Sequence, residues 1–285
     1  MISSYYTEAA MATNNEILII GPPGSGKTTF LAQLYGRLMD KKGKLQLASA
    51  PENIDGIKSA YNRLADGEET ESTPSTDNLE VKIPVINEGK EFVLHCKDYG
   101  GEQVRDLVAL MEYDKTWIDR AKTNDRWILF IRPSEIEHRF DLSKKGYAEK
   151  DQKETKAPPP GTSDQSQFIE LLQVLLHARG TGMKTPIETP RLLIALTCWD
   201  ELSTNMRSED TLRQKMPLFA QFITANWLPG AFKIVGVSAQ EFPLKTEEAR
   251  EKYQDEMPQN FGFLVLDDNQ KEKDLTRLIE QALKL

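Results

Sequence analysis

Glu16-Ile-Leu-Ile-Ile20 followed by Gly21-Pro-Pro-Gly-Ser-Gly-Lys-Thr28 is the stretch that decides the fold. Its first five residues are mainly apolar and β-branched, which predicts a short buried strand. The next eight match the pattern G-x-x-x-x-G-K-[ST] and lead into apolar residues at helical spacing, which predicts a helix over 28–39. A glycine-rich loop between a buried strand and a helix is the context in which this pattern binds phosphate.

The physical chemistry of this loop assigns a role to each part of it. Glycines let the backbone wrap an anion, and several amide N–H groups and the positive helix end would face a β-phosphate. Lys27 would reach the β- and γ-phosphates, and the Thr28 hydroxyl would ligate Mg²⁺. The residues expected to contact the nucleotide here are Gly21, Gly24, Ser25, Gly26, Lys27, Thr28 and Thr29. The loop does not select a base, because similar loops occur in AAA+ ATPases and adenylate kinases.

Composition narrows the class of protein. The 285 residues are 39% hydrophobic and carry a net charge of −8, which disfavours nucleic-acid or anionic-membrane surfaces because these need clustered positive charge. Cys96 and Cys198 are the two cysteines, and each lies in an apolar run, which favours a reducing compartment. Because a spanning run of roughly 20 apolar residues, a signal peptide and a lipidation motif are all missing, we expect a cytoplasmic protein without a membrane anchor.

The order of apolar runs predicts an α/β fold. The expected strands cover 16–20, 45–47, 79–86, 91–97, 127–131, 191–197 and 232–237, and the expected helices cover 28–39, 57–64, 103–121, 167–179, 211–227 and 274–285. We expect a three-layer sandwich around a mostly parallel six-stranded sheet with one antiparallel hairpin at its edge, where Pro84 would be tolerated. The chain would form a single domain over 1–285, with irregular insertions at about 41–70, 135–165 and 241–268.

Asp98-Tyr-Gly-Gly-Glu102 follows the second strand of the expected hairpin. Asp98 at a strand end suits Mg²⁺ held through water, and the Gly101 amide could meet a γ-phosphate. Here the chain resembles the Ras-like and translation-factor-related (TRAFAC) GTPases, and this motif is similar to the Asp-x-Gly-Gly-Gln element of Arf and Gα proteins. The resemblance implies that Glu102 stands where a glutamine orients the attacking water, with Gln103 as its neighbouring substitute. It also implies a magnesium-binding and γ-phosphate-binding Thr76, with Thr73 in reserve.

Two later sequence motifs indicate which nucleotide base the site would select. Thr197-Cys-Trp-Asp200 ends a strand where these GTPases have Asn-Lys-x-Asp, so Asp200 would accept hydrogen bonds from guanine N1–H and the exocyclic amine. Cys198 departs from that pattern, and Trp199 is either an apolar surface for the base or a core anchor. Ser238-Ala-Gln240 resembles a Ser-Ala-Lys element, which implies that Ser238 and Ala239 border the guanine O6.

The chain is similar to the enlarged double-GTPases of bacterial conflict systems, and the resemblance covers 16–240 and the closing helix. It implies a magnesium-dependent switch that binds GTP or GDP, hydrolyses GTP slowly and meets a protein partner through 68–78 and 100–106. Slow hydrolysis is expected because the Glu102 carboxylate brings negative charge toward the γ-phosphate. Two alternatives stay open: an AAA+-like or kinase-like ATP enzyme, and a module that holds nucleotide without turnover.

Overall fold

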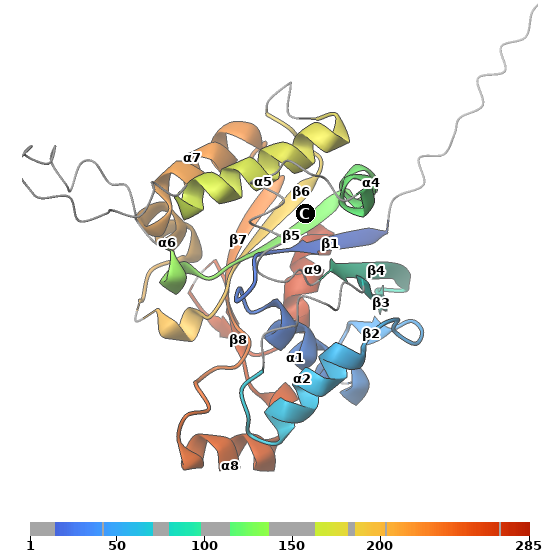
Figure 1. Cartoon of the computed structure of the whole chain (residues 1–285), viewed down its shortest axis with the longest axis vertical. Coiled ribbons are helices and arrows are strands. Elements are labelled where there is room, and N and C mark those ends of the chain that lie inside the picture. Colours follow the sequence, from blue (N-terminus) through green and yellow to red (C-terminus); the bar gives the residue numbers. More distant parts are fainter. Residues whose placement is uncertain are drawn as a thin grey trace, which may run out of the picture.

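The computed structural model describes residues 15–41, 43–70, 80–97, 115–136, 163–181, 186–202, 204–267 and 269–285. Its strands are β1 (Glu16–Ile20), β2 (Gln46–Leu47), β3 (Glu80–Asn87), β4 (Lys90–Lys97), β5 (Arg126–Ile131), β6 (Arg191–Leu196), β7 (Phe232–Ser238), β8 (Phe263–Val265) and β9 (Lys271–Glu272). Within these described ranges they form one nine-stranded mixed sheet, in the order β2-β3-β4-β1-β5-β6-β7-β8-β9 (Figure 1).

The middle of the sheet is parallel and both sides are antiparallel. β4, β1, β5, β6 and β7 pair in parallel, whereas β2, β3 and β4 pair antiparallel on one side and β7, β8 and β9 on the other. The prediction of a six-stranded sheet with one edge hairpin is therefore wrong in the number of strands. It also omits the antiparallel strands β8 and β9 next to β7. β8 and β9 are three and two residues long, too short to produce a recognisable alternating pattern.

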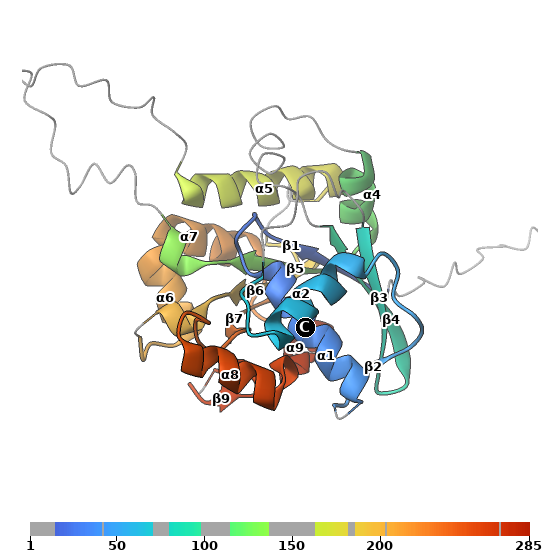
Figure 2. The same ribbon diagram turned by 60° about the horizontal axis from the view of Figure 1, so that its bottom comes forward.

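Helices cover both faces of the sheet. They are α1 (Lys27–Asp40), α2 (Asp55–Ala65), α4 (Lys115–Thr123), α5 (Asp164–Arg179), α6 (Ser208–Lys215), α7 (Pro217–Asn226), α8 (Glu247–Glu256) and α9 (Thr276–Lys284). Figure 2 shows α1, α2, α8 and α9 on one side of the strands and α4, α5 and α7 on the other. Ile17 and Ile19 of β1 belong to one apolar cluster and Leu18 and Ile20 to the second, so the core has two layers with the sheet between them.

Three expectations about individual elements are corrected. The helix expected over 211–227 is two helices, because Pro217 lacks an amide hydrogen and disfavours helical torsions at Met216, whose φ is −138°. The segment 241–268 is not irregular, since it forms α8, the 3-10 turn η3 (Pro258–Asn260) and β8. Pro84 is not on an edge strand, because β2 and the bridge between Glu52 and Lys82 flank β3.

Pro84 is tolerated in β3 for a local reason. Its carbonyl accepts a hydrogen bond from the Ala48 amide at 3.0 Å. The backbone of Lys82, whose polar groups face the same side of β3, exchanges two hydrogen bonds with the backbone of Glu52. The Pro84 nitrogen, which has no hydrogen to donate, therefore faces the side of β3 that pairs with only a few residues. No hydrogen bond between β3 and β4 is lost. No helix among the described residues has both the length and the apolar character needed to cross a bilayer.

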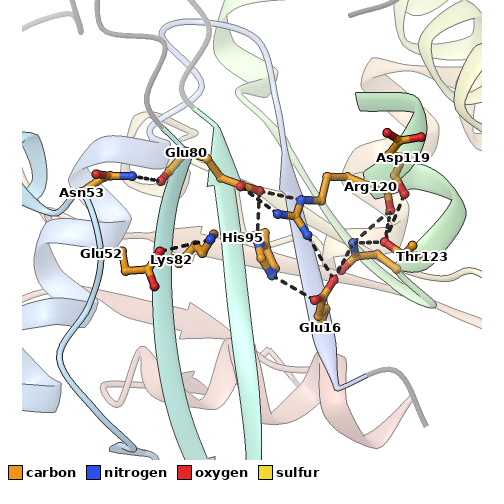
Figure 3. A network of polar contacts seen from close by, with 10 residues as sticks. Glu16, Glu52, Asn53, Glu80, Lys82, His95, Asp119, Arg120 and Thr123 are labelled. Carbon is orange, nitrogen blue, oxygen red and sulfur yellow. Dashed lines mark hydrogen bonds and ion pairs between the residues drawn. The ribbon is translucent and has the colours of Figure 1, made fainter. Parts of the chain in front are cut away.

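A polar cluster joins β1, β3 and β4 to α4 (Figure 3). Glu80 lies 3.0 Å from Nδ1 of the buried His95 and 2.8 Å from Nε of Arg120. Glu16 lies 3.5 Å from His95 Nε2 and 3.6 Å from Arg120 Nη1. The segment 98–114 connects β4 to α4, so this cluster anchors the elements on both sides of it.

Candidate nucleotide-binding site

A cleft of about 550 Å³ opens beside the loop that follows β1, a volume within the range of roughly 300–1,000 Å³ typical of small-molecule sites. It lies where the parallel strands β1, β5, β6 and β7 end, which is the common position of ligand sites in such sheets. The residues that line it are Pro23, Gly24, Gly26, Lys27, Thr28, Thr29, Phe30, Glu69, Thr70, Arg132, Thr197, Cys198, Asp200, Glu201, Val237, Ala239, Gln240, Pro243 and Lys245.

The loop from Gly21 to Gly26 has the conformation of an anion cradle. Gly24 and Gly26 take left-handed φ angles of 72° and 78°, which a residue with a Cβ adopts only with strain. Lys27 is 3% exposed, and its Nζ donates to the carbonyl oxygens of Gly21 at 2.9 Å and Pro22 at 3.0 Å. The loop therefore holds the ammonium group against its own backbone, next to the amides that would face a phosphate.

Thr197 connects the end of β6 to this loop. Its side chain is buried, and its Oγ1 lies 2.8 Å from the Ser25 carbonyl oxygen and 3.0 Å from that of Ile131. Its amide also donates to Ile131 at 2.7 Å. The sequence predicts Thr197 beside a nucleotide, and in the structure its hydroxyl fixes the loop relative to β5 and β6.

Asp200 and Ser238 meet at the same edge of the sheet. Asp200 lies in the 3-10 turn η2 (Trp199–Glu201), is exposed and lines the cleft. Ser238 is fully buried at the end of β7, and its hydroxyl donates to Asp200 Oδ1 at 2.5 Å while accepting from the Glu241 amide at 2.9 Å. Ala239 lines the cleft next to them. Two elements that are nearly 40 residues apart in the sequence thus form one wall of the cleft.

Trp199 and Cys198 are neighbours in the sequence but lie in different environments. Trp199 is 5% exposed and packs in the apolar core against Gly236, where an added Cβ would lie 2.6 Å from Trp199 Cε3. It is a core anchor and does not line the cleft, unlike Cys198. Burial raises the pKa of the Cys198 thiol to about 12, so the thiol stays protonated at neutral pH.

Sequence reasoning missed a charged group at the lip of the loop. Arg132, directly after β5, lies 3.0 Å from Glu201 Oε2 through Nε and 2.7 Å from Glu135 Oε1 through Nη1. Its Nη1 is also 3.5 Å from the Gly24 carbonyl oxygen. The hydrogen bond to Glu201 raises the pKa of Arg132 further, so it is a permanent cation. Its place at the carboxyl end of a central strand was the signal that could have identified it.

A second group of lining residues also escaped the sequence reading. Thr70 Oγ1 lies 2.8 Å from Thr29 Oγ1 on the first turn of α1, and Glu69 and Lys245 border the same space. Lys245 comes from the segment between β7 and α8. No motif marked these residues, because their position depends on how α2 and α8 pack on α1.

Several predicted residues lie outside the part of the chain that the structure describes. They are Thr73, Thr76, Asp98, Gly101, Glu102 and Gln103. Of the three predicted magnesium ligands only Thr28 is described, and it lines the cleft. Among the described residues, no three His, Cys, Asp or Glu side chains come together in a group that could hold a metal ion.

Two solved structures are similar to this chain over most of its length. Among solved structures, the chain resembles Methanosarcina barkeri Roco2 RocCORdC bound to GDP, with 16% identity and a TM-score of 0.34, over 85% of this chain and 48% of that one. It also resembles the G domain of the T. maritima FeoB iron transporter, with 12% identity and a TM-score of 0.30, over 84% of this chain and 97% of that one. The chain spans about half the length of the Roco structure.

The comparison with protein families is decisive. No curated protein matches the chain. A family model described as Double-GTPase 1 matches residues 18–282, which is nearly the whole chain and includes the loop, the cleft and the closing helix. The chain belongs to the Double-GTPase 1 family.

Proposed function

We propose that this protein is a magnesium-dependent switch that binds GTP and hydrolyses it. Its family supports guanine-nucleotide binding and GTP hydrolysis in general terms. The observation that carries the proposal is that Asp200, oriented by Ser238, opens onto the same cleft as the Lys27 loop. A carboxylate and a glycine-rich loop that line one cleft suit the base and the phosphates of a guanine nucleotide.

Guanine selectivity follows from the hydrogen-bonding capacity of Asp200. An ionised carboxylate accepts two hydrogen bonds, and guanine presents N1–H and an exocyclic amine side by side. Adenine lacks this pair of donors. Each hydrogen bond to a charged group contributes about 1.5–3 kcal/mol, so two would favour guanine over adenine by a large factor. The Ala239 amide, next to Ser238, would serve guanine O6.

The phosphate end would be held by Lys27 and the backbone amides from Gly21 to Thr29. Magnesium, which supplies charge neutralisation between β- and γ-phosphates, would be held by Thr28 together with Asp98 and Thr76. The Gly101 amide would meet the γ-phosphate, and segments 68–78 and 100–106 would present the nucleotide state to a protein partner. Glu102, or Gln103 beside it, would position the attacking water.

Nucleotide identity tests the base assignment. Purified protein should release GDP or GTP on denaturation, identified by chromatography, and should bind GDP far more tightly than ADP. In Asp200→Asn the amide keeps one acceptor and gains donors, so affinity for GDP should fall while affinity for XDP, whose C2 carries a carbonyl, should rise. A gain of XDP binding cannot result from misfolding. Equal affinities of the parent for GDP and ADP would overturn the proposal.

A second candidate is a module that holds nucleotide without turnover, and the Glu102 carboxylate at the position of the water-orienting glutamine favours it. Single-turnover measurements with excess protein separate the two. The switch predicts slow hydrolysis that requires Mg²⁺, well below the roughly 1 s⁻¹ of accelerated GTPases, and faster hydrolysis in Glu102→Gln. The module predicts intact GTP over the same time in both proteins.

A further inference from the structure

The segment between β7 and β8 reaches into the wall of the cleft. Tyr253 of α8 is fully buried, and its hydroxyl donates to the Gln240 carbonyl oxygen at 2.7 Å. Gln240 and its neighbour Ala239 both line the cleft. Burial raises the pKa of Tyr253, so its hydroxyl stays protonated at neutral pH and can donate to this carbonyl.

The same hydroxyl is bonded to the helix that follows the phosphate loop. Gln33 of α1, also fully buried, donates from Nε2 to the Tyr253 hydroxyl oxygen at 3.0 Å. Arg37, one turn further along α1, donates from Nη1 to Gln33 Oε1 at 3.2 Å and from Nη2 to the Phe261 carbonyl. Arg37, Gln33, Tyr253 and the Gln240 carbonyl thus form one continuous chain of hydrogen bonds from α1 to the base side of the cleft.

Aromatic packing fixes the Tyr253 ring in place. The ring stacks on Phe261 with centroids 4.2 Å apart and an interplanar angle of 12°. It meets Phe242 edge to face at 5.6 Å. Phe242 also meets Phe261 edge to face, with centroids 5.4 Å apart, so the three rings pack against one another and hold the Tyr253 ring in place. A buried hydroxyl held this way sets the position of the carbonyl that accepts from it.

We propose that Tyr253 is a positioning residue for guanine recognition: its hydroxyl ties the Ala239–Gln240 backbone to Gln33 of the phosphate-loop helix. This inference rests on the proposed function. Selectivity then depends on α8, an element outside the G-domain-like motifs, because an amide displaced by a few tenths of an ångström makes a poorer hydrogen bond to O6. Tyr253 itself does not line the cleft and acts through the backbone of its partner.

Tyr253→Phe tests the proposal, because it removes the hydroxyl and keeps the stacked ring. Dissociation constants of full-length, nucleotide-stripped protein for GDP and ADP would be measured calorimetrically with Mg²⁺. ADP has no O6, so we expect the ratio of ADP to GDP dissociation constants to fall by roughly three- to tenfold, the effect of one weakened hydrogen bond. Hydrogen exchange of nucleotide-free protein should show faster exchange of amides 239–242 in the variant.

Tyr61→Phe is the matched control. The Tyr61 hydroxyl donates to Gln259 Oε1 at 2.7 Å in η3, next to α8, so its loss also removes a hydroxyl bond to this segment without touching Gln240. We expect the parental ratio and parental exchange at 239–242 in this variant. An unchanged ratio and unchanged exchange in Tyr253→Phe, or an equal fall in both variants, would overturn the inference alone. A parent protein without any preference for GDP would overturn the proposed function as well.

Discussion

Ser238 donates its hydroxyl hydrogen to Asp200 Oδ1 at 2.5 Å, and this bond joins the ends of two neighbouring parallel strands. Asp200 lies on a 3-10 turn of three residues and is exposed, so its carboxylate would otherwise rotate freely. Ser238 is fully buried and is fixed in turn by the Glu241 amide. The exposed carboxylate is therefore oriented by a buried group before any ligand arrives, which lowers the entropy lost on binding.

Ser238→Ala should weaken GDP binding by roughly tenfold, because hydrogen bonds to charged groups contribute about 1.5–3 kcal/mol and the freed carboxylate must be ordered again. The change should act on guanine nucleotides and leave ADP affinity unaffected. Ser208→Ala is the control, since Ser208 is also buried but its hydroxyl has no hydrogen-bond partner among the described residues. Calorimetric titration with GDP and ADP measures both. A parental GDP affinity in Ser238→Ala would show that Asp200 needs no orienting partner.

Gly236→Ala should reduce both stability and guanine affinity. An added Cβ at Gly236 would lie 2.6 Å from Trp199 Cε3, so the indole must move, and Trp199 begins the turn that carries Asp200. Overpacking of this kind costs about 1–3 kcal/mol. Thermal unfolding and GDP titration would report it. Gly56→Ala on α2, where an added Cβ has no neighbour within 4 Å, should retain the parental affinity without any decrease in melting temperature, because alanine favours the helix. A similarly unaffected Gly236→Ala would contradict the packing argument.

Local patterns were sufficient for the centre of this fold. β1, the loop and α1 follow from an apolar run, a complete phosphate-binding pattern and helical spacing, and the structure confirms them. Asp200 and Ser238 could be named because Ser238 ends a strand and Asp200 lies shortly after another, and carboxyl ends of parallel strands share one edge. Their hydrogen bond could not be predicted, since it depends on the register between β6 and β7.

The elements that were missed lack such patterns. α8 has ten residues of which only Tyr253 is buried, so it shows no apolar periodicity, and its place comes from a single aromatic side chain. β8 depends on pairing with β7, which is a tertiary effect. Lys245 reaches the cleft through the packing of neighbouring elements, which no spacing within the sequence encodes, whereas Arg132 directly follows β5 and could have been identified from its place at a strand end.

Lys27→Ala should weaken the binding of GTP by roughly tenfold or more. Lys27 is the buried cation that the loop holds at its centre, and its loss removes at least one charge-assisted bond to phosphate, a loss of roughly tenfold or more in affinity. Lys58→Ala on the exposed face of α2 is the charge-matched control and should bind as the parent does. Filter binding with labelled GTP measures both variants. Parental affinity in Lys27→Ala would remove the basis of the proposed phosphate site.

The cluster around His95 should make stability depend on pH. Burial lowers the pKa of His95, and the nearby Arg120 cation lowers it further, against the opposing effect of Glu16 and Glu80. For Glu80, burial raises the pKa, but the hydrogen bonds and charge of Arg120 together with the effects of His95 outweigh burial and hold the pKa below its usual value, so Glu80 stays ionised in this range. Folded His95 is therefore neutral where the unfolded chain, with a histidine pKa of about 6.5, takes up a proton.

Because the unfolded state binds more protons, the contribution of His95 to the free energy of unfolding should be fully present above about pH 6.5. This contribution should decrease as the pH falls toward the lower pKa of the folded state. Urea unfolding at pH 7.5, 6.5 and 5.5 measures this dependence. His95→Gln keeps a polar group between Glu16 and Glu80 without a titrating proton, so its midpoint should decrease less than that of the parent over this range. His177→Gln, on the exposed face of α5, should follow the parent. The same decrease in His95→Gln as in the parent would assign the pH dependence to groups outside this cluster.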